Sequence, residues 1–344
     1  MLLAFSRKGS SSSASSPALV RAVRRWGTAS LVVASVVCSG VAWADSSRSI
    51  NEWLNRMHEA SRGRAYIGTL VVSAGPAMSA SRIWHVCDGS QQMERVETLT
   101  GAPRTTIRRN SDVITFDPES RTAWTEKRES LGVFPELLRT PSNLIPEFYG
   151  VDELPAERVA GHMADVIELM PKDELRFGYR IWAEKKSGLV VKMQTLGENG
   201  QVLEQVAFTE LPLDAPVRMD KLKRLMADTK GYEVLRPSLR KTTPEAEGWR
   251  LREAVPGFQS VSCHVRDPEG GRSPSMQWVF SDGLASVSLF LEPLDPERHG
   301  DEGQAVAGAT HSLSQRLADH WLTAMGEVPM PTLRRFVQSI ERVR

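Results

Sequence analysis

The chain has 344 residues, of which 41% are hydrophobic and 25% are charged. This composition is typical of a soluble globular protein with two domains, and it excludes a polytopic membrane protein. The 43 basic and 42 acidic residues nearly cancel, so the net charge gives no indication of nucleic-acid binding.

The N-terminal segment, residues 1–44, has the pattern of a secretory signal peptide. Arginines within residues 21–25 precede an apolar run over residues 31–37, and Ala-Trp-Ala at residues 42–44 has the small-x-small form of a cleavage site. The alternative is an uncleaved anchor over residues 26–43. The sequence therefore predicts an exported, periplasmic protein. The mature chain, freed of five basic residues, would carry a net charge of −4.

Export would place the cysteines in a compartment where disulfides form. Cys38 falls in the predicted signal peptide, which leaves Cys87 and Cys263. These two lie in different predicted domains, so a bridge would tether the domains together. Two thiols alone do not establish a bridge, and an unreactive buried thiol is a common alternative. The sequence leaves open whether the two cysteines are bridged.

Residues 45–211 predict a first domain built on one large antiparallel sheet. Ser49 and Glu52 have capping-box spacing at the start of a helix. Apolar residues then alternate with period two in short segments, separated by turn signals such as Asp88-Gly89 and Asn199-Gly200. The predicted strands lie near residues 66–72, 82–87, 93–99, 107, 113–116, 122–126, 164–169, 178–183, 189–195 and 202–209.

Residues 131–155 interrupt this series with four prolines among large apolar residues. Because proline prevents one long helix, we expect short helical pieces laid over an apolar surface. Two interpretations stay open: a plug that completes the core, and a mobile cover over a lipid-sized cavity.

A curled sheet with helices on its concave side would make an apolar cup. Large side chains spaced along the strands and at the end of the proline-rich segment are candidates to line it, although each would fill an ordinary core equally well. The candidate ligand-binding residues are Tyr66, Trp84, Phe116, Trp124, Phe148 and Trp182.

Residues 212–247 predict a linker, and residues 248–344 predict a smaller α+β domain. The linker contains one amphipathic helix around residues 219–226. In the second domain, Pro331 stands at a favoured first-turn position of a terminal helix. The predicted strands of this domain lie at residues 260–266, 276–280, 285–292 and 317–326, and a polar loop lies at residues 293–303.

Motifs for catalysis or metal binding are missing from the sequence. The seven histidines lack metal-ligand spacing, and the sequence contains no C-x-x-C pair, phosphate-binding loop or nucleophile elbow. Ser238-Leu239-Arg240-Lys241 matches the S-x-x-K motif of penicillin-recognising enzymes, but Ser281-Asp282-Gly283 misses the asparagine that this chemistry requires. We therefore predict no catalytic residues, no metal site and no cofactor.

Several sequence blocks, in order along nearly the whole predicted mature chain, resemble the MucB/RseB family. Phe177 departs from the family, which usually has tyrosine there, and the Ser-rich extension before Arg21 is long. The matching blocks are residues 78–85, 88–89, 94–95, 99–104, 158–161, 171–173, 176–182, 203–205 and 208–209 in the first domain, and 256–258, 280–288 and 326–329 in the second.

This resemblance implies an α+β protein whose first domain is an open half-barrel like those of the LolA/LolB lipoprotein carriers. It also implies a partner, the periplasmic segment of a single-pass anti-sigma factor, which the protein would protect from proteolysis. Lipid-type ligands, such as mislocalised lipopolysaccharide, would trigger release. The resemblance supplies no catalytic residues.

Two functions follow as hypotheses. The first is negative regulation of an envelope-stress sigma factor, in which a ligand in the cup would change the contacts between the two domains about a hinge at residues 211–247. The alternative is a periplasmic lipid or lipoprotein carrier with the same cup. Partner-contact residues, the identity of the lipid and self-association stay open.

Overall fold

The computed structural model describes residues 48–127, 144–236, 238–266 and 274–343. The predicted signal peptide, Cys38 and the first part of the proline-rich segment lie outside the described residues. Residues Ser47–Arg344 form one compact unit. Most of its elements are antiparallel strands, joined by four helices in the described ranges, so the predicted α+β class is confirmed.

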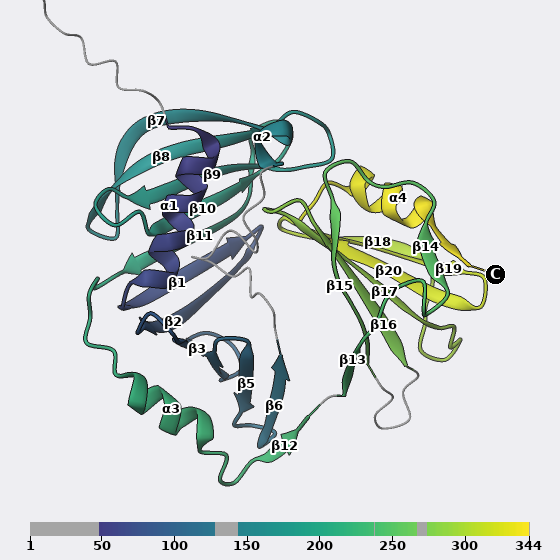
Figure 1. The fold of residues 1–344 in the computed structure, drawn as a ribbon, viewed down its shortest axis with the longest axis horizontal. Helices are drawn as coiled ribbons and strands as arrows, with labels where there is room; N and C mark the ends of the chain where they lie inside the picture. The colour runs from purple at the N-terminus through teal and green to yellow at the C-terminus, as the bar shows by residue number, and fades with distance from the viewer. Residues whose placement is uncertain (1–47, 128–143, 237, 267–273, 344) are drawn as a thin grey trace, which may run out of the picture. The chain divides into compact units, whose positions relative to one another are not determined.

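Twelve strands form the first sheet, in the order β12-β6-β5-β4-β3-β2-β1-β11-β10-β9-β8-β7 (Figure 1). All neighbours pair antiparallel except β12 and β6, which are parallel. The sheet is open, because β12 and β7 are its two edges. The strands are β1 Tyr66–Ala74, β2 Ala77–Cys87, β3 Gln92–Thr98, β4 Thr105–Arg109, β5 Asp112–Asp117, β6 Thr122–Lys127, β7 Tyr149–Val159, β8 His162–Pro171, β9 Gly178–Glu184, β10 Val190–Leu196, β11 Val202–Glu210 and β12 Glu233–Leu235.

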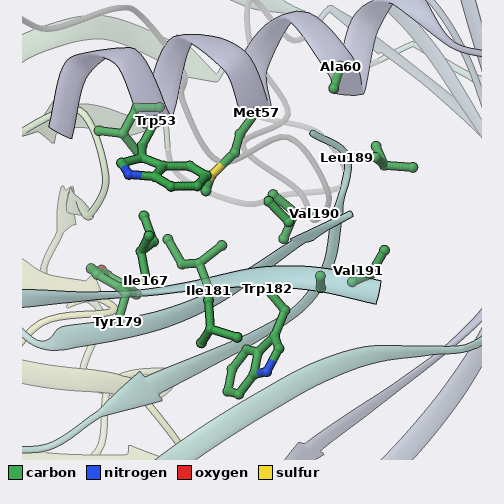
Figure 2. Packing of buried hydrophobic residues seen from close by; sticks show 14 of the residues in the cluster. Trp53, Met57, Ala60, Ile167, Tyr179, Ile181, Trp182, Leu189, Val190 and Val191 are labelled. Carbon is green, nitrogen blue, oxygen red and sulfur yellow. The ribbon is translucent and has the colours of Figure 1, made fainter. Parts of the chain in front are cut away.

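Helix α1 (Ile50–Gly63) covers one face of this sheet, which we call the α1 face. The predicted capping box is present, since the Ser49 hydroxyl accepts from the Glu52 amide and the Glu52 carboxylate accepts from the Ser49 amide. The buried side of the helix packs on the sheet, with Trp53 and Met57 directed toward Ile167 and Ile181 (Figure 2).

Helix α3 (Met219–Ala227) packs on the opposite face, over β3 and β4, and we call this the α3 face. Leu222 is the buried residue of the helix, and it clusters with Met93, Ile107 and Phe116. The sheet therefore carries a helix on each face, over different strands.

The described part of the proline-rich segment contains one short helical piece and part of a strand. Within the described residues only α2 (Ile145–Phe148) is helical, and β7 follows immediately as a long edge strand. Pro155 lies where the pairing with β8 shifts register, between Leu154 and Glu157. Proline is tolerated there because an edge strand at a bulge has no ladder hydrogen bond to lose.

Seven strands form the second sheet, in the order β13-β15-β16-β17-β20-β19-β18. Helix α4 (Met330–Ser339) covers one face, where Leu333 and Phe336 belong to the core of this sheet and the Phe336 ring centroid lies 4.8 Å from that of Phe280. The hairpin β18–β19 occupies residues that include part of the predicted loop. The strands are β13 Leu239–Lys241, β15 Gln259–Arg266, β16 Ser275–Ser281, β17 Ser286–Pro293, β18 Gly303–Ala307, β19 Thr310–Leu317 and β20 His320–Gly326, and β14 Trp249–Leu251 pairs separately with β21 Ile340–Arg342.

The predicted linker contains ordered elements. Helix α3 matches the amphipathic helix expected around residues 219–226. The short strand β12 pairs with β6 in the first sheet, and β13 pairs with β15 in the second. The chain therefore passes from one sheet to the other between residues 235 and 239.

Candidate functional site

The predicted cup residues lie on both faces of the first sheet and at its end. The pairing registers place Tyr66 and Trp124 on the α1 face, and Trp84, Phe116 and Trp182 on the opposite face, while Phe148 ends α2. Figure 2 shows Trp182 directed away from α1. The six residues therefore do not line one surface, and their contact with a ligand stays a prediction.

Two of the six residues are part of packed aromatic clusters. Tyr66 is 1% exposed, and its ring stacks on His85 with the centroids 4.9 Å apart. Phe116 meets Tyr232 edge-on at 5.1 Å. Both side chains thus fill the interior, which is one of the two roles expected for them.

Two of the tryptophans carry cations on their rings. The guanidinium carbons of Arg82 and Arg95 lie 5.6 and 4.6 Å from the Trp84 ring centroid. The Lys192 ammonium lies 4.1 Å from the Trp182 centroid, and the Trp182 indole donates to Glu157 at 2.8 Å. Such cation–π contacts are stabilising.

The α1 face changes from apolar to polar along the sheet. Beneath α1 it is apolar, whereas four buried polar side chains lie on β2, β3 and β4: His85, Gln92, Glu94 and Arg108. A nitrogen of Arg108 lies 3.2 Å from a Glu94 carboxylate oxygen. Burial raises the pKa of Glu94, and the neighbouring Arg108 opposes that shift.

The sequence did not predict this polar group, because the residues around Met93 and Glu94 show no clear alternation of apolar and polar side chains. Its only signal is a set of charged residues inside strands. A ligand with an apolar chain and a polar head group would find both kinds of side chain on the same sheet face.

A second buried polar group, which we call the Arg176 cluster, joins residues of the two sheets. The Arg176 side chain is fully buried, and its Nε donates to Asp282 at 2.8 Å. Its other nitrogens donate to Asp173 and to the Pro256 carbonyl. Burial raises the pKa of Asp282, and the Arg176 guanidinium opposes that shift.

Aromatic rings enclose the same guanidinium. The Phe148 and Phe258 ring centroids lie 4.1 and 4.9 Å from the Arg176 carbon. Gly257, at a φ of +79°, has no room for a Cβ because Arg176 and Phe148 occupy the space. The predicted cup residue Phe148 therefore belongs to the Arg176 cluster.

Around this cluster, each sheet contributes an apolar side chain to the core of the other. Leu175, beside Arg176, is part of the core under α4. Leu284, beside Asp282, packs against the core under α1. The Thr332 hydroxyl of α4 also donates to the Leu175 carbonyl at 2.7 Å. Buried polar groups with several partners fix a relative arrangement, because each lost partner leaves an unsatisfied group.

The S-x-x-K match lacks the geometry of a nucleophile site. That chemistry needs the serine and lysine one helical turn apart, but Leu239–Lys241 is strand β13. Among the described residues, no group of three His, Cys, Asp or Glu side chains is arranged to hold a metal ion. No helix in these ranges is long and apolar enough to cross a bilayer.

The two cysteines of the predicted mature chain are free thiols in the structure. Cys87 is half-buried at the end of β2, and Cys263 is buried in β15. Burial, followed by the nearby Glu247 and Glu245, raises the pKa of the Cys263 thiol to about 11.

Comparison with protein families gives two matches in chain order. Residues 49–226 match the MucB/RseB N-terminal domain, and residues 243–341 match the MucB/RseB C-terminal domain. The chain is 30% identical over 308 residues to the sigma factor AlgU regulatory protein MucB of Pseudomonas aeruginosa, covering 86% of this chain and 92% of that protein. It is 22% identical to the sigma-E factor regulatory protein RseB of Escherichia coli K12, covering 92% and 97%.

Solved structures agree with these matches. A complex of P. aeruginosa MucA and MucB matches with a TM-score of 0.67 at 26% identity, covering 86% of this chain and 99% of that one. MucB in complex with MucA(peri) matches with a TM-score of 0.64 at 27% identity, covering 86% and 100%. The similarity thus extends over both sheets.

Proposed function

Because the chain belongs to the MucB/RseB family, we propose that it is a periplasmic negative regulator of an envelope-stress sigma factor. It would bind the periplasmic segment of a membrane-bound anti-sigma factor and protect that segment from proteolysis. The observation that carries the proposal is the match of both family domains, in order, together with the likeness to MucB bound to MucA. In this role the protein needs no catalytic residue.

A lipid-type ligand is the proposed trigger of release. The α1 face supports this proposal because it carries apolar side chains beneath α1 and the buried Glu94–Arg108 pair nearby. The Arg176 cluster offers a route for coupling, since it ties the two sheets together. If ligand and partner favour different arrangements, each weakens the binding of the other by the same factor.

The test of the partner is calorimetric titration of the mature protein, residues 45–344, with the periplasmic segment of the anti-sigma factor encoded nearby. Micromolar or tighter binding is expected. Failure of the folded protein to bind this segment would overturn the regulator proposal.

The test of the trigger repeats this titration with lipopolysaccharide present. Lipopolysaccharide should weaken binding at least tenfold, and an Arg108→Gln variant should respond less than the wild type. Arg109→Gln is the matched control, because Arg109 is exposed on the same strand. If lipopolysaccharide weakens binding equally in both variants and the wild type, the Glu94–Arg108 pair is not part of the ligand site.

A carrier function is the alternative for the same fold. A carrier hands its cargo to an acceptor membrane, whereas a regulator needs only to bind a ligand and release its partner. Transfer of a fluorescent lipid between two vesicle populations separates the two functions. Rapid transfer without binding of the anti-sigma segment would favour the carrier.

A further inference from the structure

The second sheet has one face without a covering helix among the described elements, and we call it the open face. The registers identify its side chains as those that alternate with the core residues packed under α4. Across five strands the centre of the open face consists of Ser262, His264, Gln277, Val279, Ser288, Phe290, Ser312, Ser314, Thr323 and Met325. Toward the strand ends the same registers add Arg266, Glu292, Arg316 and Trp321.

The composition at the centre of the open face is unusual for a sheet surface in contact with water. None of the ten central residues is Asp, Glu, Lys or Arg, whereas Arg266, Glu292 and Arg316 lie at the margin, and Met325 is 42% exposed. The uncovered part of the first sheet, by contrast, carries Arg82 and Lys192. Depletion of charge together with aromatic and methionine side chains is typical of the centre of a protein–protein interface.

A hollow of about 1420 Å³ adjoins the open face at Ser262, His264, Gln277 and Val279. Four cationic residues also line this hollow: Lys127, Arg236, Lys241 and Arg266. Lys127 lies 3.9 Å from Asp112, which lines the hollow together with Glu126.

Two of these cations are available to a partner. Arg236 and Arg266 are exposed, and neither forms an ion pair with a described carboxylate. The hollow therefore joins an uncharged floor to a rim with unpaired positive charge. An occupant that fits has an uncharged contact surface and acidic residues beside it.

We propose that the open face docks the periplasmic segment of the anti-sigma partner, with acidic residues of that segment against Arg236 and Arg266. This inference rests on the proposed function and assigns its contact surface. A second copy of the chain fits less well, because a symmetric contact through the same patch would bring the two basic rims together.

The experiment measures the affinity of the full mature protein for the partner's periplasmic segment. Met325→Glu places a charge in the open face and should raise Kd at least tenfold. Arg266→Glu should raise Kd several-fold and reduce the salt dependence of binding. Val306→Glu is the matched control, since Val306 is 64% exposed on β18 and its register places it on the α4 side of the sheet.

The outcomes separate the inference from the proposed function. Wild-type binding with unchanged Kd in Met325→Glu and Arg266→Glu would overturn the open face as the docking surface and leave the regulator proposal standing. No binding by the wild type would overturn both. Loss of self-association in Met325→Glu, measured by sedimentation with segment binding unchanged, would assign the face to a second copy instead. Arg266→Glu keeps the test valid if Met325→Glu fails to fold, because Arg266 is exposed.

Discussion

The two sheets use their faces differently. The first sheet has α1 on one face and α3 on the other, and in β9 all residues but one are buried. Among the described elements the second sheet has a helix, α4, on one face only, and β17 alternates between buried and partly exposed residues along most of its length. A strand with one covered face displays period two in its sequence, whereas a strand buried on both sides does not.

This difference separates the two surfaces on which the proposed function depends. The proposed site of the lipid-type ligand is a covered face of the first sheet, and the proposed docking surface for the partner is the uncovered face of the second. The Arg176 cluster is one contact through which one surface could affect the other, and Phe177 against His311 is another. Substitutions in one sheet, or in the contact between the two sheets, can test whether the two surfaces are separate.

The largest effect is expected where the sheets are joined. Arg176→Ala would leave Asp282 buried without its cation, and breaking a buried ion pair costs about 3–5 kcal/mol. Urea denaturation should show this loss. Arg250→Ala is the control, since its pair with Glu341 is more exposed and should change stability by about 0–1 kcal/mol. Similar losses in the two variants would contradict a structural role for the cluster.

The next prediction compares the faces opposite α1 and α4. Trp182 is 2% exposed, so Trp182→Ala should cost about 3 kcal/mol in unfolding free energy. Phe290 on the open face is half-exposed, and Phe290→Ala should cost about 1 kcal/mol because less apolar area is lost. Equal costs would show that Phe290 is covered in the folded protein.

A smaller effect is expected from the carboxylate at the turn between β19 and β20. Hydrogen bonds from His320 and then Arg342 lower the pKa of Asp319 from 3.8 to about 2. A lowered folded-state pKa contributes stability that is present above pH 4 and is lost as the pH falls toward 2. Asp319→Asn should therefore reduce the decline of the thermal midpoint over this range, whereas Asp301→Asn, at another exposed position, should not.

The smallest effect concerns reactivity and leaves stability unchanged. The thiolate is the nucleophile, so a Cys263 pKa of about 11 predicts slow alkylation at pH 8. Cys87 should react at least tenfold faster in the native protein, as followed by mass spectrometry with iodoacetamide. In urea the two rates should converge, and a rate difference that persists there would show a cause other than folding.

Local patterns in the sequence predicted much of the fold. The Ser49 capping box, the helix around residues 219–226 and most strands follow from spacing and turn residues, and the structure confirms them. Strand β7 was missed because Pro155 signals a break, although an edge strand at a bulge accepts it. The β18–β19 hairpin was missed because β18 is exposed along its length and lacks apolar alternation.

The site was less predictable than the fold. Large aromatic residues were assigned to one cup, but the face on which a side chain lies depends on strand register, which a single sequence does not state. Trp84 and Trp124 therefore fall on opposite faces. The Arg176 cluster unites residues 106 positions apart, from Arg176 to Asp282, and no local pattern connects them.

Leu175 and Leu284 each pack in the core of the other sheet, and this affects how the protein can be divided into fragments. A truncated chain that ends with α3 would lack the surroundings of Leu175, and one that begins after α3 would lack those of Leu284. Each fragment would expose an apolar side chain and contain a void of about one leucine. Protease nicking between α3 and β13 should therefore leave the two pieces associated, and intact protein should melt in a single cooperative transition.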